Sequence, residues 1–96
     1  MARPWFKFDA TDWLGDSRLR TVSLQAKAIW IDLLCLMHQS EERGVLITNG
    51  KPWTMKDVIK RAQIGSRSAH KWVQELTTKG VIKVREDGAF YSKRMV

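Results

Sequence analysis

The sequence predicts one small α+β domain with three main helices and a C-terminal β-hairpin. Three segments carry apolar residues at helical spacing. The last of them is followed by two alternating segments that meet at Asp87-Gly88. The length of 96 residues and the hydrophobic content of 44% suit a single core. We therefore treat residues 1–96 as one domain.

The first part of the chain contains a weak strand pattern and a short helix pattern. Residues 5–8 alternate weakly and suit a short strand or an arm that packs on the core. Residues 9–16 suit a turn or a short helix. Asp9 is the expected cap of that helix, and Trp13 and Leu14 are its expected buried residues.

The strongest helix pattern covers residues 23–40. Ser23 suits the N-cap position, and no Gly or Pro interrupts the sequence up to Gln39. We expect one buried stripe, formed by Leu24, Ala28, Ile31 and Cys35. A broader apolar flank is expected beside it, formed by Trp30, Leu33, Leu34 and Met37. A helix that is apolar on most sides belongs at the centre of a domain or packs against a second chain.

A tight hairpin and a second helix are expected next. Within residues 45–53, Asn49-Gly50 suits a type I′ turn because both positions accept positive φ. Thr54 and Asp57 resemble a capping box with a shorter acid, so the helix is expected to begin at Thr54. Its apolar positions repeat at helical spacing: Met55, Val58, Ile59 and Ala62.

A third helix is expected over residues 66–79, after a three-residue turn that contains Gly65. Ser66 is the expected cap and Gly80 the expected stop. The expected buried face consists of Ala69, Trp72, Val73 and Leu76.

The C-terminal hairpin is expected to pair residues 81–86 with residues 89–95. Apolar and basic residues alternate along its first strand, which predicts one apolar and one basic face: Ile82, Lys83, Val84 and Arg85. The predicted elements follow the order of a winged helix-turn-helix: helix, short strand or hairpin, helix, short turn, helix and hairpin.

The charge of the chain is concentrated in its second half. The net charge is +7, and residues 1–48 contain six basic and six acidic side chains, which cancel. Residues 49–96 contain eleven basic and four acidic side chains. This asymmetry indicates a polyanionic partner, because clustered Lys and Arg residues attract phosphates.

The outward side of the predicted helix 66–79 carries candidate contacts to duplex DNA. In the major groove, Arg and Lys pair with guanine and Gln pairs with adenine, and hydroxyls with free N–H groups at a helix N-terminus suit a phosphate. The candidates on this helix are Ser66, Arg67, Ser68, His70, Lys71 and Gln74. Candidate phosphate contacts on the preceding helix and the hairpin are Lys56, Lys60, Lys83, Arg85 and Lys93.

Several other classes of protein are not supported by the sequence. No apolar run reaches the length of a membrane span, and residues 1–9 lack the apolar region of a secretory signal. Cys35 is the single cysteine, so a reducing compartment such as the cytoplasm is expected. His38 and His70 are far apart, so no metal site is expected. We expect no enzyme and no cofactor, because no catalytic triad or Walker A loop occurs.

Five short motifs spread over nearly the whole chain: Trp5-Phe-Lys-Phe8, Asp12-Trp13-Leu14, Ile31-Asp32-Leu33-Leu34, Gly65-Ser66-Arg67-Ser68 and Tyr91-Ser-Lys-Arg94. Together they resemble the N-terminal winged-helix domain of phage and prophage replication initiators, the group that includes DnaD-like replisome organisers. The resemblance implies binding of double-stranded origin DNA and a homodimer. It also implies contact with a helicase or helicase loader through a region absent from this chain. The chain would then be the N-terminal domain of a longer protein.

Three alternatives stay open at this point. A winged-helix transcriptional regulator would use the same groove contacts. A protein-interaction or oligomerisation module of a replisome would turn its basic face to an acidic partner, and its binding to DNA would not depend on Arg67. The five tryptophans also suit stacking on single-stranded DNA if they form an exposed row.

Overall fold

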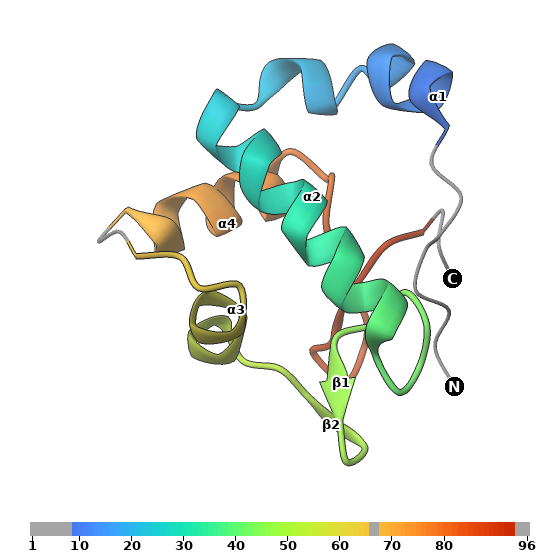
Figure 1. The fold of residues 1–96 in the computed structure, drawn as a ribbon, viewed down its shortest axis with the longest axis vertical. Helices are drawn as coiled ribbons and strands as arrows, with labels where there is room; N and C mark the ends of the chain where they lie inside the picture. The colour runs from blue at the N-terminus through green and yellow to red at the C-terminus, as the bar shows by residue number, and fades with distance from the viewer. Residues whose placement is uncertain (1–8, 66–67, 94–96) are drawn as a thin grey trace.

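The computed structural model describes residues 9–65 and 68–93. Within these residues the chain forms four α-helices, one short 3₁₀ helix (η1) and two two-stranded antiparallel sheets (Figure 1). Their bounds are α1 (Ala10–Gly15), η1 (Leu19–Thr21), α2 (Leu24–Gln39), β1 (Ile47–Thr48), β2 (Lys51–Pro52), α3 (Met55–Arg61), α4 (Ala69–Thr78), β3 (Lys83–Val84) and β4 (Phe90–Tyr91). The predicted α+β class is confirmed.

The core lies between α2, α3, α4 and the C-terminal hairpin. The helix α2 crosses the domain in front of that hairpin in Figure 1 and packs mainly against α4. One cluster of buried side chains joins η1, these helices and the segment before β3; its largest members with almost no exposure are Leu19, Leu33, Met37, Leu46, Leu76 and Ile82. Of the predicted inner face of α4, Ala69, Val73 and Leu76 are buried and Trp72 is half-buried.

The predicted caps of the first three helices are confirmed. The Asp9 carboxylate accepts the N–H of Asp12 at 3.1 Å, and the Ser23 hydroxyl accepts the N–H of Ala26 at 3.1 Å. Thr54 and Asp57 form the predicted capping box, in which each side chain accepts the backbone N–H of the other residue. These bonds satisfy N–H groups that the first turn of a helix otherwise leaves unpaired.

The buried face of α2 differs from the expectation. The side chains that face the core are Ala26, Ile29, Trp30, Leu33, Leu34, Met37 and His38. By contrast Leu24 is 78% exposed, Ala28 and Cys35 are exposed, and Ile31 is half-buried. Both sets repeat at helical spacing, and at about 100° per residue their centres lie roughly 150° apart around the helix. The bulkier set packs against α4, so the prediction for the narrower stripe was wrong. Leu14, also expected inside, is 65% exposed.

The connection between α3 and α4 is longer than the predicted three residues. The helix α3 ends at Arg61, and two residues later Gln63 takes a left-handed conformation with φ of 56°. The N–H groups of Gln63 and Ile64 then return to the carbonyls of Lys60 and Ile59 at 3.2 Å each, which closes a Schellman motif.

The helix α4 is also shorter than expected. It begins at Ala69, not at Ser66, and Ser68 occupies its N-cap position without a side-chain cap bond. Ser66 and Arg67 lie outside the described residues. At the other end, the predicted stop is confirmed, because Gly80 has a φ of 77° and the N–H of Val81 returns to the carbonyl of Leu76 at 2.9 Å.

Both predicted turns are present, and the strands beside them are short. Asn49 and Gly50 have φ values of 53° and 73°, as a type I′ turn requires, and they join β1 to β2. In the C-terminal hairpin, Lys83 pairs with Tyr91 and Val84 with Phe90. Val84 is 49% exposed, which corrects the expectation of an apolar face that includes it.

The strand β4 has neighbours on both sides. Beyond β3, the segment 44–46 runs along its other edge, where the N–H of Leu46 donates to the carbonyl of Phe90 at 2.9 Å. The N–H of Ser92 donates to the carbonyl of Gly44, also at 2.9 Å. The segment that follows α2 is thereby joined to the last strand of the chain.

A carboxylate of α4 is bonded to the N-terminus of α2. Glu75 accepts the backbone N–H of Ser23 at 2.6 Å and the Ser23 hydroxyl at 2.8 Å. The same Ser23 oxygen accepts the N–H of Ala26, so the three groups form a chain of hydrogen bonds. The negative charge is stabilised there, because the N-terminal end of a helix carries a partial positive charge. This contact fixes α4 against the start of the central helix.

Replacing Glu75 should therefore destabilise the fold. We expect Glu75→Ala to lower the free energy of unfolding by about 1–3 kcal/mol, because it removes two hydrogen bonds to a charged acceptor. Urea denaturation followed by circular dichroism measures this value. The adjacent exposed residue supplies a matched control, Gln74→Ala, which should change the free energy by less than about 0.5 kcal/mol. Equal stabilities of the two variants would contradict the role given to Glu75.

Candidate nucleic-acid interface

The exposed side of α4 carries three of the side chains predicted to contact DNA, namely His70, Lys71 and Gln74. Four exposed residues make up this outer α4 face: His70, Lys71, Gln74 and Thr78. They alternate with the buried positions of the same helix at helical spacing, so they point away from the core. Ser68, at the N-cap position, is also exposed.

The outer α4 face contains no acid because the only acidic residue of α4, Glu75, is bonded to the start of α2. Two of the other three acids in the second half of the chain are also engaged in local structure. Asp57 closes the capping box of α3, and the bonds from the Thr54 backbone N–H and hydroxyl lower its pKa. Asp87 pairs with Arg85. The positive charge of this half is therefore little offset on its outward surfaces.

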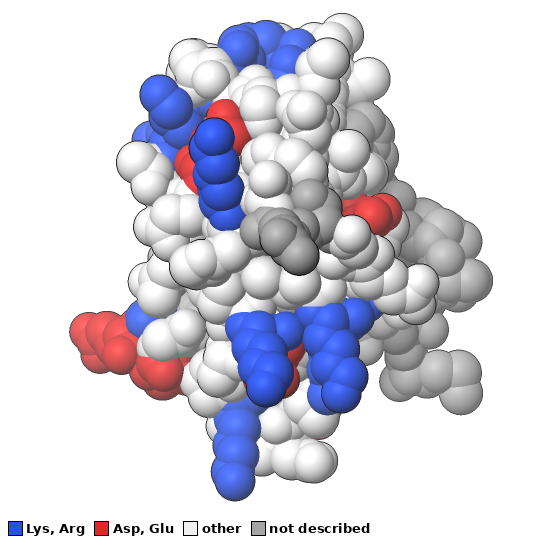
Figure 2. Space-filling view, turned by 90° about the vertical axis from the view of Figure 1, so that its left-hand side faces the viewer, with Lys and Arg blue, Asp and Glu red and all other residues white. Residues whose placement is uncertain are grey.

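The helix α3 adds cations beside α4. Lys56, Lys60 and Arg61 are all exposed. The guanidinium of Arg61 lies 4.7 Å above the ring centre of the buried Trp53, a cation–π contact that holds this side chain against the domain. Figure 2 shows the side of the domain that carries α3 and α4. Lys and Arg side chains gather there in an upper and a lower group, and uncharged residues make up most of the described surface between them.

On the hairpin, Lys83 lies near Arg18, a cation that was not among the predicted DNA contacts. A Cβ atom at Gly80 would lie 3.4 Å from Cδ and Nε of Arg18 and 3.6 Å from Nζ of Lys83. Both cations thus converge over the C-terminal end of α4, where the helix carries partial negative charge. Residue spacing could not point to Arg18, because this residue precedes α4 by about fifty positions and is brought there by η1.

Arg85 is engaged in ion pairs. Its guanidinium lies 2.7 Å from the carboxylate of Glu42 and 2.7 Å from that of Asp87. The two carboxylates raise the pKa of Arg85, and the Arg85 guanidinium lowers the pKa of Asp87 to about 2. Because two acids neutralise this cation, we remove Arg85 from the set of expected phosphate contacts. It ties the hairpin to the segment after α2 instead.

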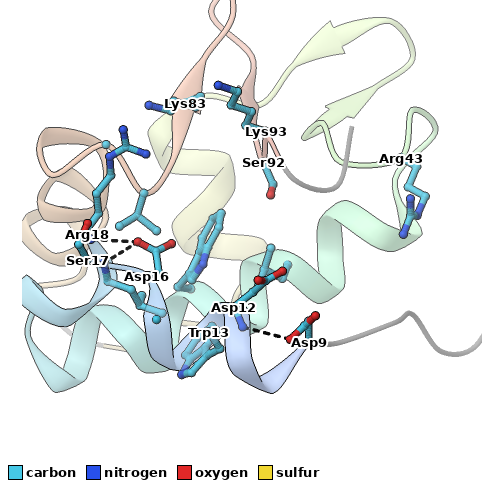
Figure 3. Close-up of a pocket in the computed structure, with 16 residues that line it drawn as sticks. Asp9, Asp12, Trp13, Asp16, Ser17, Arg18, Arg43, Lys83, Ser92 and Lys93 are labelled. Atoms are coloured by element: carbon cyan, nitrogen blue, oxygen red, sulfur yellow. Dashed lines mark hydrogen bonds between the residues drawn. The ribbon is translucent and has the colours of Figure 1, made fainter.

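An open pocket of about 670 Å³ lies between α1, η1 and the hairpin (Figure 3). Its lining includes the acids Asp9, Asp12 and Asp16 and the cations Arg18, Lys83 and Lys93, of which Lys93 is exposed. Because acids and bases share its wall, the pocket is not a purely basic surface. Lys83 and Lys93 both come to it from the hairpin (Figure 3).

The comparisons with known proteins return no relative. No family model matches the chain, and no curated protein or solved structure matches it either. Within residues 9–65 and 68–93, no group of three or more His, Cys, Asp or Glu side chains is placed to hold a metal ion. The helices of the same residues include none that is long and apolar enough to cross a membrane.

The ion pair of Asp87 should make part of the stability sensitive to acid. The pKa of Asp87 in the fold is about 2, below its ordinary value of 3.8, so the pair stabilises the fold above pH 3.8 and is lost as the pH falls to 2. We expect Asp87→Asn to lower the melting temperature at pH 6. Between pH 4 and pH 2, the melting temperature of this variant should fall less than that of the unchanged protein. Thermal melts followed by circular dichroism measure both.

The neighbouring exposed acid gives the control. Glu86→Gln should leave the melting temperature at pH 6 and its acid dependence close to those of the unchanged protein. If Asp87→Asn and the unchanged protein lose stability in parallel between pH 4 and pH 2, the ion pair does not contribute to the acid dependence.

Proposed function

We propose that this chain is a winged helix-turn-helix domain that binds double-stranded DNA. In this proposal α4 enters the major groove and the β3–β4 hairpin lies on the flanking backbone. The observation that carries the proposal is the outer α4 face, which has Lys71 and Gln74 exposed while the acid of the same helix is bonded to α2. A groove lined with phosphates repels acids, and the fold has removed the acid from this surface.

The arrangement of elements supports the winged-helix part of the proposal. The helices α3 and α4 are consecutive and contact each other, as the two helices of a helix-turn-helix do. The hairpin follows α4, and its second strand also pairs with the segment 44–46 that follows α2. This pairing corresponds to the short strand between helices that the sequence predicts.

The tryptophans favour duplex over single-stranded DNA. Trp30 and Trp53 are buried, and Trp13 and Trp72 are half-buried against the core. Within the described residues, no exposed row of aromatic side chains is available for stacking on unpaired bases. Trp5 lies outside the described residues.

A role in replication initiation by a phage or mobile element rests on the resemblance of the five short motifs alone. We propose it as the biological setting, with a helicase or its loader contacted by another region of a longer protein. A transcriptional regulator would place the same α4 in the same groove. The DNA sequence that the domain prefers distinguishes the two functions. A replication initiator is expected to prefer duplexes from its own replication origin over promoter fragments.

The proposal is tested by titrating salt against three probes. These are origin-region duplex, random duplex and single-stranded DNA, each measured by fluorescence anisotropy. Five cations outside ion pairs are proposed to contact phosphates, namely Lys56, Lys60, Lys71, Lys83 and Lys93, which predicts a slope of log K against log salt of about −4.5 on duplex. Tighter binding to the single strand would refute the proposed docking. Weak binding to every probe, with no dependence on the outer α4 face, would favour a protein-interaction module.

Replacing Gln74 tests direct base recognition. We expect Gln74→Ala to weaken binding to a preferred duplex by about 1–3 kcal/mol, and to leave binding to random duplex nearly unchanged, because the lost bond reads a base edge. The exposed Thr78, one turn further along α4, gives a comparison through Thr78→Ala. Losses that are equal on preferred and random duplex would show that Gln74 does not read sequence.

Replacing Lys60 tests the phosphate contacts. We expect Lys60→Gln to weaken all duplexes alike and to make the salt slope shallower by about 0.9, since one phosphate contact is lost. The control is Arg43→Gln, which removes the same charge from the loop between α2 and β1, on the opposite side of the domain from α3 and α4 (Figure 1). Similar changes in the two variants would mean that net charge alone, and no defined surface, determines binding.

A further inference from the structure

The side of α2 that faces away from the core is apolar. It consists of four residues, which we call the outer α2 stripe: Leu24, Ala28, Ile31 and Cys35. Leu24 is 78% exposed, Ala28 and Cys35 are exposed, and Ile31 is half-buried, with part of its side chain packed against the core. Among the described residues the other large exposed apolar side chains are Leu14 and Val84, which stand alone. The outer α2 stripe is therefore the one apolar row on a helix face of the described residues.

The spacing of the outer α2 stripe is that of a coiled-coil seam. Successive members are four, three and four residues apart, which corresponds to the d, a, d and a positions of a heptad repeat. Ala26, Ile29 and Leu33 occupy positions of the same heptads that would face away from a partner helix. These residues are buried in the domain's own core. The helix therefore has one face built for its own domain and a second built for another helix.

The charges beside the stripe indicate which helix that is. Lys27 and Asp32 flank it on opposite sides, at the g and e positions of the same heptads. In a parallel pair of identical helices, a g residue lies beside the e residue five positions later in the partner. Lys27 of each copy would thus meet Asp32 of the other. Neither side chain has an ion pair or side-chain hydrogen bond within the part of the chain that the structure describes.

We propose that two copies of this chain associate through the outer α2 stripe, with their α2 helices parallel and related by a two-fold axis. The contact buries four small or medium side chains from each copy, and two Lys27–Asp32 pairs set its direction. Such a contact is isologous, so it closes at a dimer. It is smaller than a standard stable interface, so the dimer should form and dissociate with protein concentration. This inference does not depend on the proposed binding of DNA.

The stripe is tested by sedimentation equilibrium without DNA, from about 1 μM to about 1 mM protein. The full chain should pass from monomer to dimer over this range. Leu24→Glu should weaken the dimer at least about tenfold, because it places an unpaired charge in the contact. Leu14→Glu alters an apolar residue of α1 that is 65% exposed and outside the stripe, and should leave the association unchanged. A chain that stays monomeric at every concentration would overturn the proposal, as would equal effects of both variants.

Charge exchange tests the partner and its direction. Asp32→Lys should weaken the dimer several-fold, because Lys27 would then face a lysine. Adding Lys27→Glu to this variant should restore the dimer, because the pairs are rebuilt with their charges reversed. Restoration requires that the two residues meet across the interface. A double variant that associates no better than Asp32→Lys would therefore overturn the parallel arrangement.

Cys35 gives a covalent test with a different readout. A parallel dimer brings the two Cys35 thiols to the same level of the seam, within the range that a disulfide can bridge. Oxidation by copper phenanthroline and dioxygen should then give a covalent dimer on non-reducing gels, and Leu24→Glu should suppress it. If deleting residues 1–8 is what permits dimerisation, that segment covers the stripe in the full chain and the proposal fails.

Discussion

The contact between Glu75 and Ser23 determines much of what this domain presents to its surroundings. A carboxylate in the middle of α4 would ordinarily point to water, where it would lie among Lys71 and Gln74. Here it is taken to the positive end of α2, where two hydrogen bonds and the helix dipole stabilise it. The same bonds hold α4 in place beneath α2. Packing of the core and the charge of the outer surface are thus set by one interaction.

The central helix α2 has two apolar faces, and only one of them is buried in the main core. Trp30, Leu33 and Met37 are buried in the core, and this set is bulkier than Leu24, Ala28 and Cys35 on the opposite side. Burial of larger side chains removes more apolar area from water, so the bulkier face turns inward. The narrower face is left on the outside, where Lys27 and Asp32 border it.

Local signals were enough to predict the ends of most elements. Ser23, Thr54, Asn49-Gly50 and Gly80 each act within a few residues, and each has the predicted role in the structure. The sequence could not show which of two equally spaced apolar faces of α2 would be buried, since that depends on α4, more than thirty residues further along the chain.

Interactions across long sequence separations account for the other differences. Glu75 and Ser23 are 52 residues apart, and Arg85 and Glu42 are 43 residues apart, so neither pairing follows from spacing. The exposure of Lys71 and Gln74 was predicted correctly, because it depends on helix periodicity alone. The expectation for Arg85 needed revision, because its charge is neutralised by acids that only the fold brings near.

The left-handed Gln63 at the end of α3 has a consequence for how the chain leaves that helix. Most helices that end in this way use glycine, which accepts the conformation without strain but leaves the unfolded chain very free. A residue with a side chain restricts that freedom at the joint and accepts a local strain in return. The hydrogen bonds from the N–H groups of Gln63 and Ile64 to the last turn of α3 must offset that strain, so the direction in which the chain leaves α3 is set by the helix end itself.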